Sequence, residues 1–396
     1  MPVSSELSLY IHIPFCQKKC PYCDFNTFAG LNRLHESFTD ALVQEIELAG
    51  AQRNRPAVKT VFIGGGTPTV LPPIQLNRIL TTIRRAFRIL PDAEITSEAN
   101  PGTVDSLRFA ALRQMDINRL SLGVQSFDDG ELQFLGRIHD AATARAAVGA
   151  ARRTGFNNIN LDLIFGLPFQ TTATWRASLR QAIDLHPEHL SLYSLTIEEN
   201  TPFADWAAAG RFPYPDPDRA ADLYEIAVEL LADAGYLQYE ISNWARADAH
   251  STHEPGESAI SGPECRHNLT YWRNETYLGF GPGAHSSERG VRWSNQRLVP
   301  EFIRTIGNGS SPVDSAEEID APLAMGETMM LGLRLTEEGV GYQRFERKHG
   351  AALIDVFGQE VVELTRLGLL EQLPDRIRLA PEARLIGNQV FVRFLP

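Results

Sequence analysis

One pattern limits what this chain can fold into more than any other: short apolar runs alternate with amphipathic segments of helical spacing through its first half. The six runs expected to form strands are 7–13, 58–63, 93–99, 119–124, 158–165 and 189–195. Strands separated by helices require right-handed crossovers and a parallel sheet. A closed barrel needs about eight such units, so six predict an α/β fold with an open, partial (β/α)6 barrel.

The segments between these runs have the apolar spacing of helices. The expected helices are 34–48, 74–87, 104–115, 131–135, 141–154 and 172–186. A further helix at 218–234 and a short extra strand at 239–242 follow the sixth unit.

The composition divides the chain into a barrel at 1–245, an exposed loop with a histidine–tyrosine motif at 246–314, and a carboxyl-terminal domain at 315–396. Residues 247–263 have almost no large apolar side chains, which predicts a mobile loop in which His250 and His253 are solvated. Helices at 319–331, 341–349 and 353–366 precede short strands at 369–372, 377–379 and 390–394. This order indicates a small helical, winged-helix-like module, a fold that does not fix a function.

Charge and hydropathy exclude some partners. The net charge of −12 argues against nucleic acid, because phosphate contacts require a basic face. We find no apolar run long enough to cross a bilayer and no signal peptide, so we expect a cytoplasmic protein with reduced thiols. Peripheral contact with a membrane stays open.

Three of the four cysteines, Cys16, Cys20 and Cys23, follow the first expected strand in C-x3-C-x2-C spacing. A structural zinc site takes four protein ligands, and no second pair stands at a suitable spacing. Three thiolates suit a [4Fe–4S] cluster with one iron left open for an exchangeable ligand. Zinc or plain buried thiols remain the alternatives on spacing alone.

With Tyr22 before the last cysteine and the run GGGTP at 64–68, this stretch resembles the signature of the radical S-adenosylmethionine superfamily. The resemblance implies that the open iron binds the methionyl amino and carboxylate groups of S-adenosylmethionine, whose sulfonium is then cleaved by one electron from the cluster. We expect the glycines to let backbone groups approach the ligand without an intervening Cβ.

Further motifs extend the resemblance over nearly the whole chain, to the oxygen-independent coproporphyrinogen III oxidase-like (HemN-like) branch. They are YIHIPFC (10–16), SEANP (97–101), GVQSF (123–127), LGRIH (135–139) and NLDLIFGLP (160–168). The resemblance implies that S-adenosylmethionine is bound by Tyr10, Tyr22, Gly65, Gly66, Thr67, Glu98, Gln125, Arg137 and Asp162. The carboxylates suit an ammonium or ribose hydroxyls, and the guanidinium suits a carboxylate. Taken singly, each polar residue has the alternative role of a helix cap or a surface group.

Two functions compete within this branch: coproporphyrinogen III dehydrogenase and HemW-type haem chaperone. The dehydrogenases resembled here have a fourth cysteine where this chain has Phe25, and a longer segment before the first cysteine. The motif H-N-x-x-Y followed by Trp272 is associated with the chaperones. All three features favour a chaperone. A radical methyltransferase is a weaker third class, because a further cysteine would have to accept the methyl group, and Cys265 is the only one outside the cluster motif.

In a helix, His267 and Tyr271 lie four residues apart on one face, so both can address one ligand. Imidazole, phenolate and the thiolate of Cys265 are all known kinds of axial haem ligand. The alternative is that His267 and Tyr271 pack or hydrogen-bond at the barrel mouth.

We therefore expect a haem chaperone that holds a [4Fe–4S] cluster, S-adenosylmethionine and haem and delivers haem to respiratory haem proteins. The resemblance further implies a reduced flavodoxin- or ferredoxin-type electron donor. No residue is assigned a catalytic role, and a homodimer and turnover of S-adenosylmethionine stay open.

Overall fold

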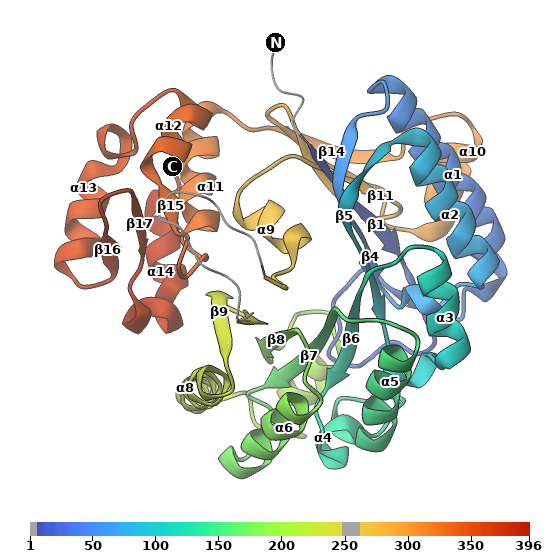
Figure 1. Ribbon diagram of the computed structural model, residues 1–396, viewed down its shortest axis with the longest axis horizontal. Helices are drawn as coiled ribbons and strands as arrows, with labels where there is room; N and C mark the ends of the chain where they lie inside the picture. Colours follow the sequence, from blue (N-terminus) through green and yellow to red (C-terminus); the bar gives the residue numbers. More distant parts are fainter. Residues whose placement is uncertain (1–5, 248–261) are drawn as a thin grey trace.

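A single sheet of 12 strands carries the fold of the computed structural model, which describes residues 6–247 and 262–396 (Figure 1). The six expected strands are present, parallel and adjacent in chain order: β1 (Leu7–Ile13), β4 (Ala57–Gly65), β5 (Arg88–Ala99), β6 (Arg119–Gln125), β7 (Ile159–Phe165) and β8 (His189–Ser194). The predicted partial barrel is confirmed.

Helices cover the outer face of this sheet (Figure 1): α1 (His35–Gln52), α2 (Pro73–Ala86), α3 (Ser106–Gln114), α4 (Asp129–Phe134), α5 (Ala141–Arg153) and α6 (Thr172–Asp184). Helix α2 shows why, since Leu76, Ile79, Leu80 and Ile83 are buried at helical spacing on one face. The strands between the helices are buried on both faces, as parallel strands usually are.

The sheet extends beyond the barrel at both edges. A seventh parallel strand, β11 (Tyr277–Phe280), pairs with β1 and is followed by the antiparallel strands β12 (His285–Glu288), β13 (Val291–Asn295) and β14 (Val313–Glu318). At the other edge, β10 (Asn243–Arg246) joins β8 to β9 (Tyr236–Glu240). The single strand predicted at 239–242 was wrong, because residues 241 and 242 form the turn between these two strands.

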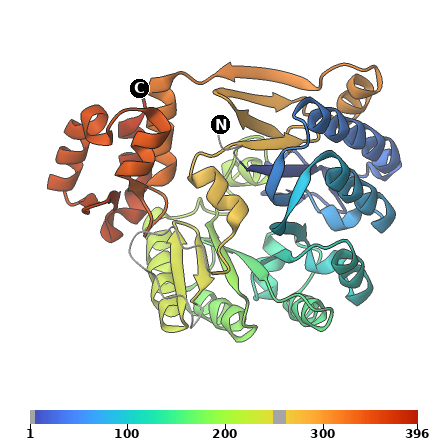
Figure 2. The same ribbon diagram turned by 45° about the horizontal axis from the view of Figure 1, so that its top comes forward.

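Three further helices connect these parts: α7 (Pro202–Ala208), α8 (Pro217–Asp233) and α10 (Val299–Gly307). The short helix α9 (Arg266–Trp272) carries the H-N-x-x-Y motif and lies inside the curve of the sheet (Figures 1 and 2). The loop predicted at 247–263 falls almost wholly outside the described residues, and the domain boundaries stay predictions.

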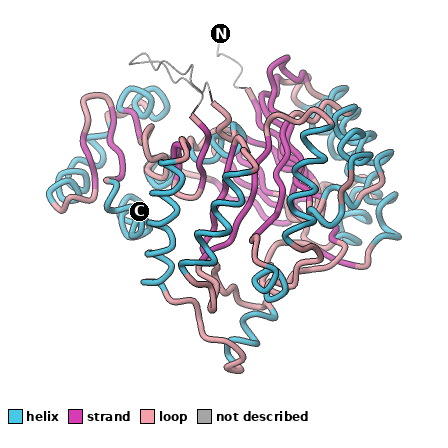
Figure 3. Tube along the Cα trace, turned by 60° about the horizontal axis from the view of Figure 1, so that its bottom comes forward, coloured by secondary structure: helices cyan, strands magenta, loops and turns pink. Residues whose placement is uncertain are grey.

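The carboxyl-terminal residues form a module with its own core, built around Met329, Phe345, Val361 and Ile377. Its elements are α11 (Ala321–Gly332), β15 (Val340–Gly341), α12 (Tyr342–His349), α13 (Leu353–Arg366), β16 (Leu370–Gln372), β17 (Arg376–Leu379) and α14 (Gly387–Phe391). Figure 3 shows its short strands apart from the main sheet. No helix among the described residues is long and apolar enough to span a membrane.

The strand predicted at 390–394 was wrong. These residues continue α14 into a 3-10 turn, Val392–Phe394. Gly387, Val390, Phe391 and Phe394 are buried, and their spacing of three, four and seven residues from the first is that of one helix face. β-branched and aromatic content pointed to a strand, but the packing period decides the structure.

Candidate functional site

The three cysteines lie on a loop that β1 delivers to the carboxyl ends of the parallel strands. Two short paired strands, β2 (Phe15–Cys16) and β3 (Phe28–Ala29), close the base of this loop. Cys16, Cys20 and Cys23 all line one cavity of about 480 Å³, here called the cysteine cavity. The structure therefore brings the thiols together at the sheet edge where the sequence places them.

Polar groups surround the sulfurs. Thr67 Oγ1 lies 3.8 Å from Cys16 Sγ, and Arg137 Nη1 lies 3.4 Å from Cys20 Sγ. Burial raises the pKa of the Cys16 and Cys23 thiols, so iron binding would release protons. No three His, Cys, Asp or Glu side chains in the described ranges are arranged to hold one metal ion. A four-iron cluster does not need such convergence, because each thiolate binds a separate iron.

Arg137 is held in place with one donor unused. Its Nη2 donates to Gly123 O at 2.7 Å, and its Nη1 also reaches Tyr22 Oη at 3.4 Å. Its Nε is buried and has no hydrogen-bond partner in the structure. A buried guanidinium with a free donor beside the thiols suits the carboxylate of an amino-acid ligand.

Two carboxyl groups face the same cavity from the strand ends of the barrel. Glu98 accepts a hydrogen bond from Gly65 N at 3.0 Å, while Asp162 accepts from Asn160 Nδ2 at 2.8 Å and Ser121 Oγ at 3.1 Å. Burial and the nearby Asp162 raise the pKa of Glu98 to about 8. The cavity thus has cationic groups beside the thiols and carboxyl groups beside the barrel, which suits a ligand with both charges.

The glycine run allows two parts of the backbone to approach each other closely. A Cβ on Gly65, whose φ is +105°, would lie 2.4 Å from the ring of His12, and one on Gly66 would lie 2.6 Å from Phe15 O. The amide of Gly66 donates to Ile13 O at the end of β1, and the amide of Thr67 donates to Phe15 O at the start of the cysteine loop. The glycines therefore let β4 pack closely against the end of β1. Gly65 and Gly66 also line the cysteine cavity, so the expected approach of their backbone to a ligand stays a prediction.

Eight of the nine residues expected to bind S-adenosylmethionine line the cysteine cavity: Tyr22, Gly65, Gly66, Thr67, Glu98, Gln125, Arg137 and Asp162. Gln125 stands at the end of β6 with φ +71°, a strained value for a residue with a side chain. Sequence reasoning missed further lining residues, namely Lys18, Lys19, Asn100 and 193–196 with Glu198. Residues 193–196 and Glu198 stand at or just after the end of the sixth strand, so the strand pattern could have identified them as lining residues.

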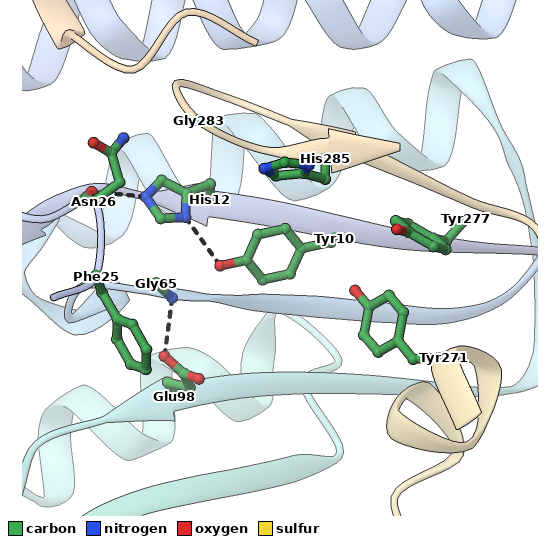
Figure 4. Close-up of a pocket in the computed structure, with 10 residues that line it drawn as sticks. All are labelled: Tyr10, His12, Phe25, Asn26, Gly65, Glu98, Tyr271, Tyr277, Gly283 and His285. Carbon is green, nitrogen blue, oxygen red and sulfur yellow. Dashed lines mark hydrogen bonds between the residues drawn. The ribbon is translucent and has the colours of Figure 1, made fainter. Parts of the chain in front are cut away.

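Tyr10, the ninth residue, lies elsewhere. It lines a second cavity of about 380 Å³, here called the tyrosine cavity, which is shown in Figure 4. The other lining residues are His12, Phe25, Asn26, Gly65, Glu98, Tyr271, Tyr277, Gly283 and His285. Phe25, Gly65 and Glu98 line both cavities, so the two spaces adjoin, and the Phe25 side chain is 63% exposed between them.

Of the two expected haem ligands, only Tyr271 faces this space. His267 is buried, with Nδ1 2.8 Å from Thr60 Oγ1 and Nε2 2.9 Å from Tyr271 Oη. Burial lowers the pKa of His267 to about 3, so its ring is neutral. Cys265 is buried beside Glu94 and lines neither cavity.

Comparisons with known proteins show the class and the family of this chain. The family model of the radical SAM superfamily matches residues 10–182, and that of the HemN C-terminal domain matches residues 319–386. Coproporphyrinogen III oxidase (HemN) of Escherichia coli superposes with a TM-score of 0.81 over 98% of this chain and 90% of its own, at 24% identity. The likeness to HemN shows a shared fold. The match to the radical SAM family model shows the class of the chain: a radical SAM protein, a class that binds a [4Fe–4S] cluster and S-adenosylmethionine.

Two relatives narrow the class to a family. Heme chaperone HemW of Escherichia coli is 44% identical over 394 residues, 98% of each chain. Heme chaperone HemW of Bacillus subtilis is 38% identical over 98% of this chain and 99% of its own. The chain belongs to the HemW family.

Proposed function

We propose that this chain is a haem chaperone, which binds haem in the tyrosine cavity and holds a [4Fe–4S] cluster and S-adenosylmethionine in the cysteine cavity. The observation that carries the proposal is the shared wall: Phe25, Gly65 and Glu98 line both cavities. Tyr271 of the H-N-x-x-Y motif faces the haem side of that wall, and the relatives named above are called haem chaperones. Respiratory haem proteins are the proposed acceptors.

The residues divide between two ligands in this proposal. Cys16, Cys20 and Cys23 hold three irons of the cluster, and the eight expected residues of the cysteine cavity hold S-adenosylmethionine. The free Nε of Arg137 takes the ligand carboxylate, and Glu98 takes a cationic group. We assign Tyr10 to haem instead, because it lies beside Tyr271 in the tyrosine cavity.

The volume of the tyrosine cavity and the types of side chain that line it suit a porphyrin. About 380 Å³ lies within the range of pockets for cofactor-sized molecules. Tyr10, Tyr271 and Tyr277 supply aromatic surface for a flat ring, and their hydroxyls supply polar contacts. A reduced flavodoxin- or ferredoxin-type protein is the proposed electron donor to the cluster.

The experiment separates a carrier from an oxidase. The anaerobically reconstituted protein is given coproporphyrinogen III, S-adenosylmethionine and a strong reductant, and in parallel is titrated with haem. We expect stoichiometric haem binding without protoporphyrinogen IX, and weaker binding by Tyr271→Phe. Tyr214→Phe is the matched control, because Tyr214 is exposed and lines neither cavity. Protoporphyrinogen IX formation at an enzymatic rate would identify a coproporphyrinogen dehydrogenase.

A further inference from the structure

We propose that His285 supplies the imidazole that ligates haem iron in the tyrosine cavity. This inference rests on the proposed function, since it names the protein group that binds the iron. His285 begins β12 and lines the cavity on the side of Tyr10 away from Tyr271 (Figure 4). It lies 18 residues beyond the histidine of the H-N-x-x-Y motif and outside that motif.

The other nearby histidines have no free ring nitrogen. His12 is bonded through Nδ1 to Tyr10 Oη and through Nε2 to Asn26 O, each at 2.9 Å. His267 is bonded through both nitrogens, to Thr60 and to Tyr271, and does not line the cavity. Either ring would have to break a buried hydrogen bond before it could bind iron.

His285 could bind iron without first breaking a hydrogen bond. Within residues 6–247 and 262–396, its ring nitrogens make no hydrogen bond, and its side chain is exposed to the cavity. Partial burial and the charges of Arg292 and Arg297 lower its pKa, so the ring is neutral at neutral pH. A neutral imidazole is the form that binds a metal.

The backbone that carries His285 is held firmly. His285 pairs with Ser294 across β12 and β13, and its carbonyl lies so close to Gly279 that a Cβ there would be 2.1 Å away. Both ends of the β12–β13 hairpin are tied to the cysteine loop, because Asn26 Nδ2 donates to Pro282 O before β12 at 3.0 Å and to Arg297 O after β13 at 2.9 Å. The imidazole is thus presented by a rigid hairpin that contacts the loop of the cluster cysteines.

His267 then has a positioning role. Its Nε2 fixes the hydroxyl of Tyr271, and its Nδ1 is fixed in turn by Thr60 on β4. The H-N-x-x-Y histidine thus orients the tyrosine at the cavity, while His285 on β12 would bind the iron.

The test is haem titration of the reconstituted full-length protein, followed by absorption, EPR and resonance Raman spectra of the ferric complex. We expect His285→Ala to lose the signature of imidazole ligation and to bind haem roughly tenfold or more weakly, and added imidazole to restore the signature. We expect His267→Ala to keep that signature although its affinity falls. His186→Ala is the matched control, because His186 is exposed and outside both cavities.

Unequal outcomes distinguish the two proposals. If wild type and His285→Ala give the same spectra and affinity, His285 is not the ligand, and the chaperone function stands. Loss of the imidazole signature in His267→Ala alone would return the ligand to the motif. If the wild type binds no haem, the proposed function and this inference fail together.

Discussion

The affinity for S-adenosylmethionine should rise between pH 6 and pH 7, because the carboxyl group proposed to face a cationic part of the ligand is protonated in the free protein. Burial and Asp162 raise the pKa of Glu98 to about 8, so this group is mostly neutral at pH 7. The ligand carries a permanent sulfonium charge and favours the ionised carboxylate. Binding must therefore release a proton, and the affinity must increase with pH below the raised pKa.

The size of the effect follows from that pKa. With a value of about 8, roughly 1% of Glu98 is ionised at pH 6 and about 9% at pH 7. Ionisation of Glu98 should then lower the dissociation constant by about tenfold across this unit, which is about 1.4 kcal/mol. The ligand's α-amino group, with a free pKa of about 7.7, also loses a proton when it binds iron, and this contribution is the same with or without Glu98, so the effect of Glu98 is the difference between two slopes.

Isothermal titration of the reconstituted protein with S-adenosylmethionine at the two pH values measures this change. Glu98→Gln still offers an acceptor to Gly65 N but cannot ionise, so across this unit its affinity should rise about tenfold less than that of wild type. Glu131→Gln is the matched control, because Glu131 is a buried carboxyl of raised pKa that lines neither cavity, and the variant should keep the wild-type slope. An equal slope in Glu98→Gln and wild type would refute the assignment of Glu98.

Three other predictions concern the cluster and the helix that carries the tyrosine. Cys20→Ala should lose iron and visible absorption after reconstitution; a protein that keeps both would contradict the cluster assignment. Glu94→Gln should weaken the start of α9 by about 1 kcal/mol in hydrogen exchange, because Glu94 accepts from His267 N at 3.1 Å; unchanged exchange would exclude this cap. Arg273→Ala should loosen the carboxyl-terminal module by roughly 1–2 kcal/mol, since Arg273 donates to Glu338 at 2.9 Å and 3.1 Å; thermal unfolding identical to wild type would argue against this contact.

The barrel was readable from the sequence because its signals are local. Each of the six strands is a buried apolar run, and each crossover helix has its own apolar face. Connection rules for parallel strands then fix their order without knowledge of distant contacts. The cysteine cavity follows for the same reason, since its residues stand at the ends of consecutive strands.

What the sequence did not reveal depends on contacts between distant segments. The four residues Tyr277–Phe280 give no local sign that they pair with β1. The division of the site into two adjoining cavities was not foreseen: Tyr10 lines the tyrosine cavity with His12, two residues along the same strand face, and its expected contact with S-adenosylmethionine stays a prediction. The hydrogen bonds of His267 could not be foreseen either, because Thr60 lies far away in the chain.

The pairing of β1 with β11 also sets an order of events during synthesis. Ser8 pairs with Tyr277, so the first strand made must wait for most of the chain before its outer edge is covered. At about 5–20 residues per second, that interval is on the order of tens of seconds. The cysteine loop and β4 are complete early, whereas Tyr277 and His285 are made late. We therefore expect the cysteine cavity to form on the nascent chain before the tyrosine cavity, which is proposed to bind haem, is complete.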